Sequence, residues 1–190
     1  VRFMYLPEGV KEAVENGFNM YPDFPDPGKV YHNNVLEIFS QRLNNSERSD
    51  IQKYYDYWEI SPEMKDDKYY VLAQTQGLLP TDTFEFLAEY YPIKGLRFTS
   101  EISGLTKRQI PSGTLKEGDM LQWKLEPSNP YDKYAVKLYK DNKELGYVKT
   151  IHSKVFHDSK YKKFAIKVKS VEQNGHTNRV FISVSTINVR

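Results

Sequence analysis

The amino-acid sequence predicts an α+β fold in two parts: a small domain of helices and strands over residues 1–92, and a six-stranded β-barrel of the OB or SH3 type over residues 93–190. Apolar residues recur at helical spacing mainly in the first part. Short strands separated by turns rich in Gly, Pro and Asn fill the second part, a pattern that favours closure into a barrel. The balance of charge also changes between the two parts.

Two helices are predicted in the first part from apolar residues at helical spacing. The apolar face of the first consists of Val35, Leu36, Phe39 and Leu43. The second follows a capping-box pattern of Ser49 with Gln52. Its apolar face consists of Ile51, Tyr54, Tyr55 and Trp58. Because aromatic residues at this spacing mostly pack in a core, we interpret this face as packing, not as a binding site.

Three further features complete the first part. Ser61-Pro62 predicts the start of a third helix, since proline is tolerated at the first helical position, and Gly77 predicts its end. Residues 81–86 alternate in character and predict a strand. The chain begins at Val1, without Met, in a strand-like run to Tyr5. We therefore expect that a preceding segment is missing or that the chain is an excised piece of a longer protein.

The second part supplies the barrel and its core. A short helix is predicted from Ile151 to His157, across one mouth of the barrel. The predicted core consists of Leu121, Trp123, Leu125, Val136, Leu138, Val148, Phe164, Ile166, Val168, Val180, Ile182 and Val184.

Charge is unevenly distributed along the chain. The whole sequence has 27 Lys and Arg against 25 Asp and Glu. Residues 1–92, however, hold 8 basic and 16 acidic residues, whereas residues 93–190 hold 19 basic and 9 acidic ones. A basic half of this kind indicates a nucleic acid or another anionic surface as partner.

Several function classes are disfavoured. The chain has no Cys, which excludes disulfides and thiol chemistry, and no apolar run long enough for a membrane span, so we expect a cytoplasmic protein. Neither of the glycine-rich nucleotide-binding patterns occurs. His152 and His157 lack the spacing of a helical zinc pair, and we expect both to be exposed. A hydrolase or nuclease would need clustered carboxylates with a metal, so we predict no enzyme, no catalytic residue, no metal and no cofactor.

A turn motif is the most informative feature of the basic half. The run from Glu126 to Val136 reads EPSNPYDKYAV, and Gly146-Tyr147-Val148 follows a strand-like segment. Asn129-Pro130 opens a turn, because proline fixes its own φ and favours an extended residue before it. Asn129 and Asp132 can bond nearby backbone amides, which leaves Tyr131 at the tip.

With its flanking sequence, this motif resembles the signature of the HIRAN domain, a small β-barrel found in chromatin remodellers, DNA-repair helicases and bacterial proteins of unknown role. In the helicase-like relatives an OB-type barrel captures the free 3′ end of single-stranded DNA. The resemblance to a bacterial HIRAN-domain protein implies that DNA, as a single strand or a 3′ end, is the partner. It also implies binding roles for Asn129, Tyr131 and Asp132.

The relatives also use an arginine and an aromatic residue from a Gly-Leu-Arg-Tyr-like segment on the first strand. The best match here is Gly104-Leu105-Thr106-Lys107, and Leu96-Arg97-Phe98 is a second candidate. In the first match the arginine is replaced by Thr106, so we expect only a weak preference for a free 3′-hydroxyl. Lys107 and Arg108 then provide charge for phosphates.

A basic strand extends the predicted surface. Phe164, Ile166 and Val168 share one face of the strand. The opposite face carries Lys163, Lys167 and Lys169. With Lys133 and Lys137 these lysines complete the predicted nucleic-acid surface, although a solvated outer face of a barrel shows the same pattern.

The acidic half gives an alternative function. Its pattern of elements resembles the small N-terminal subdomain of HipA-type toxin kinases. That resemblance implies a protein-interaction or regulatory module, similar to an antitoxin, that docks a HipA-type kinase or a helicase through residues 1–92.

Overall fold

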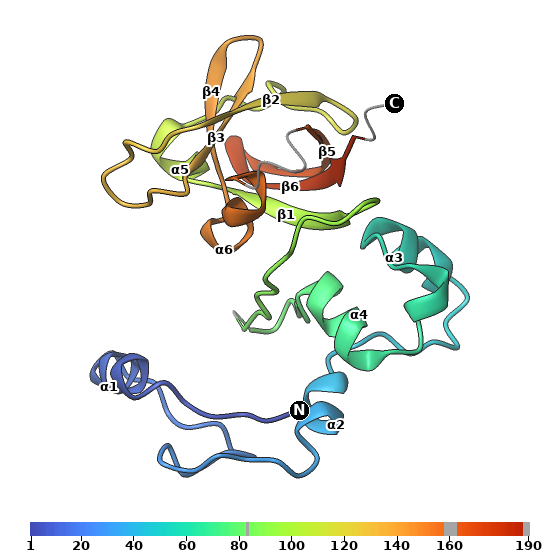
Figure 1. The fold of residues 1–190 in the computed structure, drawn as a ribbon, viewed down its shortest axis with the longest axis vertical. Helices are drawn as coiled ribbons and strands as arrows, with labels where there is room; N and C mark the ends of the chain where they lie inside the picture. The colour runs from blue at the N-terminus through green and yellow to red at the C-terminus, as the bar shows by residue number, and fades with distance from the viewer. Residues whose placement is uncertain (83, 158–162, 188–190) are drawn as a thin grey trace.

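The computed structural model describes residues 1–82, 84–157 and 163–187. The first part contains α1 (Pro7–Glu15), α2 (Val35–Ser40), α3 (Ile51–Tyr57), the 3-10 helix η1 (Pro62–Met64) and α4 (Lys68–Thr75). The second part contains β1 (Arg97–Ser103), α5 (Leu105–Arg108), β2 (Met120–Leu125), β3 (Val136–Lys140), β4 (Lys143–Val148), α6 (Thr150–Ser153), η2 (Lys154–His157), β5 (Phe164–Asn174) and β6 (His176–Thr186). Figure 1 shows the helical region below the barrel.

The six strands close into a barrel in the order β1-β4-β3-β2-β5-β6. Every neighbouring pair is antiparallel. The predicted fold class, a helical N-terminal region followed by a six-stranded barrel, is confirmed. Among the described residues, no helix combines the length and apolar character needed to cross a membrane.

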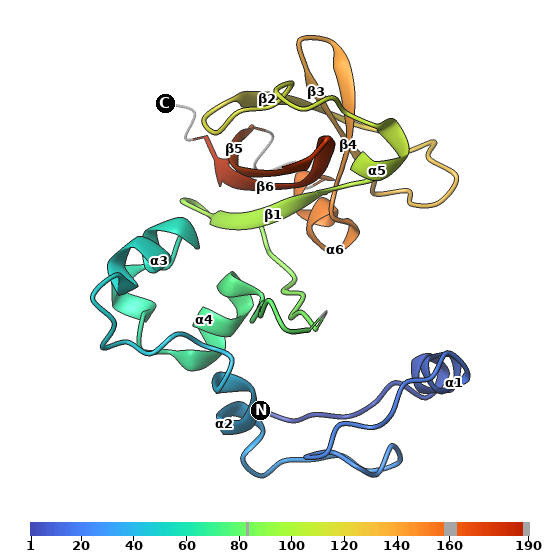
Figure 2. The same ribbon diagram turned by 180° about the vertical axis from the view of Figure 1, so that it is seen from behind.

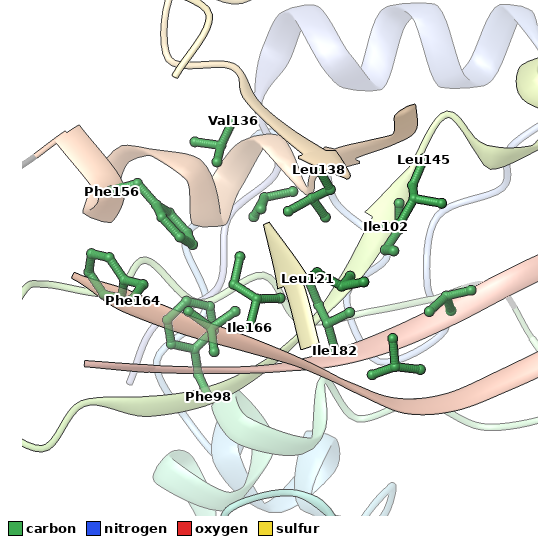
Figure 3. Close-up of a cluster of buried hydrophobic side chains, with 14 of the residues drawn as sticks. Phe98, Ile102, Leu121, Val136, Leu138, Leu145, Phe156, Phe164, Ile166 and Ile182 are labelled. Carbon is green, nitrogen blue, oxygen red and sulfur yellow. The ribbon is translucent and has the colours of Figure 1, made fainter. Parts of the chain in front are cut away.

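The barrel core contains the residues that the sequence predicts. Ten of the twelve are buried, and Trp123 and Leu125 are partly buried against the same cluster. Figure 3 shows side chains from several strands and from η2 converging in this core. The sequence prediction missed part of it, because β1 and the segments around α5 and η2 show no clear alternation. The missed residues are Leu96, Phe98, Ile102, Leu105, Ile110, Leu115, Leu145, Val155 and Phe156.

The predicted short helix after β4 is present as α6 and η2, and Val155 and Phe156 carry it into the core. The expectation that its histidines are exposed is wrong. His152 is buried, with Nδ1 2.8 Å from Ser100 Oγ, and burial lowers the pKa of its imidazole to about 4. His157 is half-buried, and its Nε2 donates to the carbonyl of Tyr134 at 3.1 Å.

The predicted helices of the first part are present as α2 and α3, but details differ. Ser49 does not cap α3, which has Asp50 at the cap position without a side-chain hydrogen bond. The predicted third helix is divided into η1 and α4, because Asp67 starts a new helix by accepting hydrogen bonds from two backbone amides. No strand forms over residues 81, 82 and 84–86, and the run from Val1 forms a single bridge, between Phe3 and Tyr31. The sequence interpretation also missed α1.

The helices α3 and α4 pack on the outside of the barrel, on the side of β1 (Figures 1 and 2). Phe181 of β6 is the centre of this contact, since it lies in one cluster with Trp58, Ile60 and Val71. The aromatic face of α3 is therefore packing, as predicted, and its partner is the barrel. We call the outer surface around Phe181 and Lys169 the docked face.

Tyr90, in the segment between α4 and β1, packs against the barrel. Its ring stacks on Phe98 with the centroids 4.1 Å apart and lies 5.2 Å from the ring of His152. The division of the chain into domains of residues 1–92 and 93–190 stays a prediction. Tyr90, although it precedes this boundary, packs against the barrel.

Candidate nucleic-acid interface

The turn between β2 and β3 has the conformation that its sequence predicts. Asn129 Oδ1 accepts hydrogen bonds from the backbone amides of Tyr131 at 3.0 Å and Asp132 at 3.2 Å. Asp132 Oδ1 accepts one from the amide of Tyr134 at 2.8 Å. With the backbone held by these bonds, the side chain of Tyr131 stays at the tip, and the residue is 96% exposed.

Glu126 fixes the base of this turn. Its Oε2 accepts from Asn129 Nδ2 at 2.8 Å and from the Tyr147 hydroxyl at 2.9 Å, and the carboxylate also forms an ion pair with Lys137. The hydrogen bond from Lys137, followed by the one from Asn129, lowers the pKa of Glu126 to about 2. In return, Glu126 raises the pKa of the Lys137 ammonium group. Lys137 is thus held inside the protein's own ion pairs.

The helical turn α5 faces the turn motif. Gly104 follows β1 and caps α5 with a φ of 82°, a conformation that glycine adopts without steric cost. Leu105, the first residue of α5, is buried. Arg108 donates from Nε to Glu144 Oε1 at 3.0 Å, and its guanidinium lies 5.2 Å from the centre of the Tyr147 ring. Lys107 is exposed. The segment Gly104 to Lys107 therefore lies just after the first strand, and its expected place on that strand is wrong.

The helical turn α5 and the turn between β2 and β3 form the two walls of a groove of about 790 Å³. Five of the predicted site residues line it, namely Lys107, Arg108, Asn129, Tyr131 and Asp132. The lining residues that the site prediction missed include Glu126, Tyr147 and Thr150. The Gly146-Tyr147-Val148 motif was the signal for Tyr147, because its register places this residue between Ser103 of β1 and Lys137 of β3.

The position before Tyr147 requires a glycine, Gly146. A Cβ atom at this position would collide with the carbonyl oxygen of Ser103 on the neighbouring strand. The glycine allows β4 to approach β1 closely, which brings Tyr147 to the groove.

The second candidate for the arginine-aromatic pair lies elsewhere. Arg97 and Phe98 are at the start of β1, and the groove is at its end, so about 20 Å of extended strand separates them. Arg97 lies 3.8 Å from Glu59, and Phe98 is fully buried under Tyr90. The structure brings only the Gly104 to Arg108 candidate to the turn.

The remaining predicted lysines are divided between two surfaces. Lys133 is exposed beside the turn, and its Nζ lies 5.1 Å from the Tyr134 ring centre. Lys163 and Lys167 are exposed outside the groove. Lys169 was wrongly predicted as part of a continuous exposed row. Its side chain is only 11% exposed and lies 3.2 Å from Glu59, because α3 covers this end of β5, and burial lowers its pKa.

Other barrel cations are also paired with the acidic half. Lys149 binds Glu85, and Lys154 binds Glu89 at 2.9 Å. Part of the positive charge of residues 93–190 is therefore neutralised by carboxylates of residues 1–92. Among the described residues, no group of three or more His, Asp or Glu side chains could hold a metal ion.

Two solved structures are similar to part of the chain. The HIRAN domain of human HLTF has 21% identity and a TM-score of 0.38, over 47% of this chain and 75% of that one. A protein from Lactobacillus plantarum has 17% identity and a TM-score of 0.38, over 50% of this chain and 96% of that one.

No curated protein sequence matches the chain. None of the comparisons supports the resemblance of the acidic half to HipA-type kinases, which stays a hypothesis. The family model of the HIRAN domain matches residues 87–186, more than half of the sequence, and this stretch includes every strand of the barrel. The chain therefore belongs to the HIRAN-domain family.

Proposed function

We propose that the protein binds single-stranded DNA and places a terminal nucleotide in the groove between α5 and the Asn129–Asp132 turn. One observation carries this proposal. Two segments more than 20 residues apart, which the sequence separately marks as binding elements, line the same groove, and an aromatic side chain stands fully exposed at its rim. Membership in the HIRAN family supports DNA as the ligand.

The turn residues have distinct roles. Tyr131 stacks on a base, an interaction that tolerates any sequence because every base has a π-face. Asn129 acts mainly by shaping the turn, since its carbonyl oxygen already accepts two backbone hydrogen bonds. Asp132 uses one oxygen for the amide of Tyr134, and its second oxygen can accept from a base or from a terminal hydroxyl.

Phosphate binding depends on which cations are available. Arg108 and Lys137 are bound to Glu144 and Glu126, so their charge is largely compensated. Lys107 and Lys133 are exposed on either side of the groove and can approach a phosphate. We expect moderate affinity that decreases with salt, because each neutralised phosphate releases counterions. The protein acts in this proposal by binding and not by catalysis.

Fluorescence anisotropy with labelled oligonucleotides tests the proposal. The titrations compare single-stranded DNA, blunt duplex DNA and single-stranded RNA, and the variants are Tyr131→Ala and the control Tyr69→Ala, which removes an exposed tyrosine from α4. We expect single-stranded DNA to bind most tightly and only Tyr131→Ala to weaken it. Equal binding of all three nucleic acids by wild type and both variants would contradict the proposal.

Recognition of the 3′ end is a finer part of the proposal. Thr106 and Lys107 occupy the groove where the relatives have arginine and an aromatic residue, so we expect less than a tenfold preference for a free 3′-hydroxyl over a 3′-phosphate. A stronger preference would require a cation other than Arg97, which is paired at the far end of β1.

Docking of a kinase-like or helicase partner through the acidic half is the alternative. Three carboxylates of that half, Glu59, Glu85 and Glu89, are already paired with cations of the barrel. Such a partner would have to use other residues of the acidic half.

A further inference from the structure

Three lysines on the outer surface of the barrel form a basic face that lies outside the groove. The basic face consists of Lys124 of β2, Lys163 just before β5, and Lys167 of β5, all exposed. Figures 1 and 2 show β2 on the side of the barrel away from α3 and α4. The helical region therefore leaves this face open.

Several other lysines of the barrel are paired with carboxylates or covered by the helical region. Lys140 pairs with Asp119, Lys149 with Glu85 and Lys154 with Glu89, and Lys169 is covered by α3. Within the part of the chain that the structure describes, no carboxylate forms an ion pair with a lysine of the basic face. Three lysines without a carboxylate partner among the described residues thus lie together on one surface.

Lys124 has no ion-pair partner among the described residues. Lys124 lies directly opposite Lys137 in the pairing of β2 with β3. Glu126 and Glu144 compensate Lys137 but not Lys124. Lysines often protect exposed sheet edges from pairing with other chains, yet a closed barrel has no such edge. A bound anion would compensate Lys124.

The strand register connects the basic face to the groove. Tyr147 in the groove lies opposite Lys137, and Lys137 lies opposite Lys124. The β2–β5 pairing aligns Met120 with Lys167, and the same register continued along β2 brings Lys124 opposite Lys163. Adjacent strands are about 4.8 Å apart, so a row of about 14 Å leads from Tyr147 to Lys163.

We propose that a single strand whose end occupies the groove continues across β3 and β2, and that Lys124, Lys163 and Lys167 neutralise its phosphates. This inference rests on the proposed function of the groove. It predicts that affinity rises with oligonucleotide length until the strand covers the basic face and then levels off. A partner held by the groove alone would bind with an affinity independent of length.

The test measures the affinity of the full chain for single-stranded DNA of about two, six and ten nucleotides. The test variant carries Lys124→Gln, Lys163→Gln and Lys167→Gln. The matched control carries Lys11→Gln, Lys53→Gln and Lys65→Gln, which removes the same charge from exposed positions of the helical region. Thermal unfolding of both variants checks that the fold is retained, as exposed substitutions permit.

We expect the test variant to lose about tenfold or more in affinity for the longest strand and to stay within about twofold of wild type for the shortest. The control should stay within about twofold at every length. Equal loss in both variants, or no gain in affinity with length in the wild type, would overturn this inference but leave the groove proposal standing. Failure of Tyr131→Ala to weaken the shortest strand would instead refute the groove itself.

Discussion

The groove and the docked face combine the same kinds of residue on one barrel, yet they differ in accessibility. The groove presents Tyr131 and Lys107, and the docked face presents Phe181 and Lys169. Tyr131 is 96% exposed, whereas Phe181 is 6% exposed beneath Trp58. An aromatic residue and a lysine on the same barrel are therefore no guide to binding until the packing of the rest of the chain is known.

The same comparison applies to charge. A basic half beside an acidic half indicates an anionic partner. Some of the basic residues, however, already form ion pairs with Glu59, Glu85 and Glu89 of the same chain. What remains for nucleic acid is the smaller set of cations that no helix covers. Lys107 and Lys133 at the groove and the three lysines of the basic face belong to this set.

The largest effect is expected at the docked face. Phe181→Ala should lower the free energy of unfolding by about 3 to 5 kcal/mol, because it removes the buried ring that holds the helical region to the barrel. Chemical denaturation measures this change. DNA affinity of the folded variant should stay within about twofold of wild type. A loss of stability below about 1 kcal/mol would show that the docking of α3 and α4 is not maintained in solution.

Burial of His152 should make the stability of the protein depend on pH. Its pKa is about 4 in the folded protein against about 6.5 when exposed, so the unfolded chain binds the proton more readily. The contribution of His152 to stability is then constant above about pH 6.5 and decreases as the pH falls toward 4, by at most about 3 kcal/mol.

Urea unfolding at several pH values measures the His152 effect. His152→Gln should flatten the curve between pH 6.5 and 4.5, and His176→Gln, at an exposed site, should not. An unchanged slope in His152→Gln would rule out this histidine as the cause.

Tyr131→Ala is the corresponding change in the groove. It should weaken binding of single-stranded DNA by about 1 to 3 kcal/mol, the contribution of one stacked base. The melting temperature should hardly change, because an exposed tip residue contributes little to stability. If the variant instead unfolds more easily and binds normally, Tyr131 has a structural role.

The smallest effect is expected on the salt dependence of binding, and it distinguishes a lysine of the groove from a lysine of the docked face. Lys107→Gln should reduce the salt dependence of binding by about 0.7 in log–log slope, as expected for one phosphate contact with a single strand. Lys169→Gln should leave this slope unchanged, since Glu59 and α3 cover its ammonium group. Anisotropy titrations at increasing salt measure both. Equal changes in the two variants would mean that DNA reaches the docked face.

The sequence predicts much of the barrel and of the turn because both depend on local rules. Alternation in β5 and β6 determines which residues face the core, and Asn129 and Asp132 bond backbone amides within three residues. The burial of Lys169 and His152 depends on segments far away in the chain, and no local pattern reports such contacts.

The role of Tyr147 in the groove also required the fold. The Gly146-Tyr147-Val148 motif identifies the strand, but only the pairing with β1 and β3 brings its ring between the two walls. The strand predicted over residues 81–86 failed for the opposite reason. Its alternation reflects Phe84 and Phe86 packing with Phe39, without a neighbouring strand.

Amide chemical shifts in a titration with single-stranded DNA test the central claim most directly, because they compare the two regions in one experiment. We predict that the largest changes occur at Gly104 to Arg108, Asn129 to Lys133 and Tyr147, and that the amides of Lys169 and Phe181 stay unchanged. The largest changes at Lys169 and Phe181, with the turn unaffected, would contradict the assignment of DNA binding to the groove.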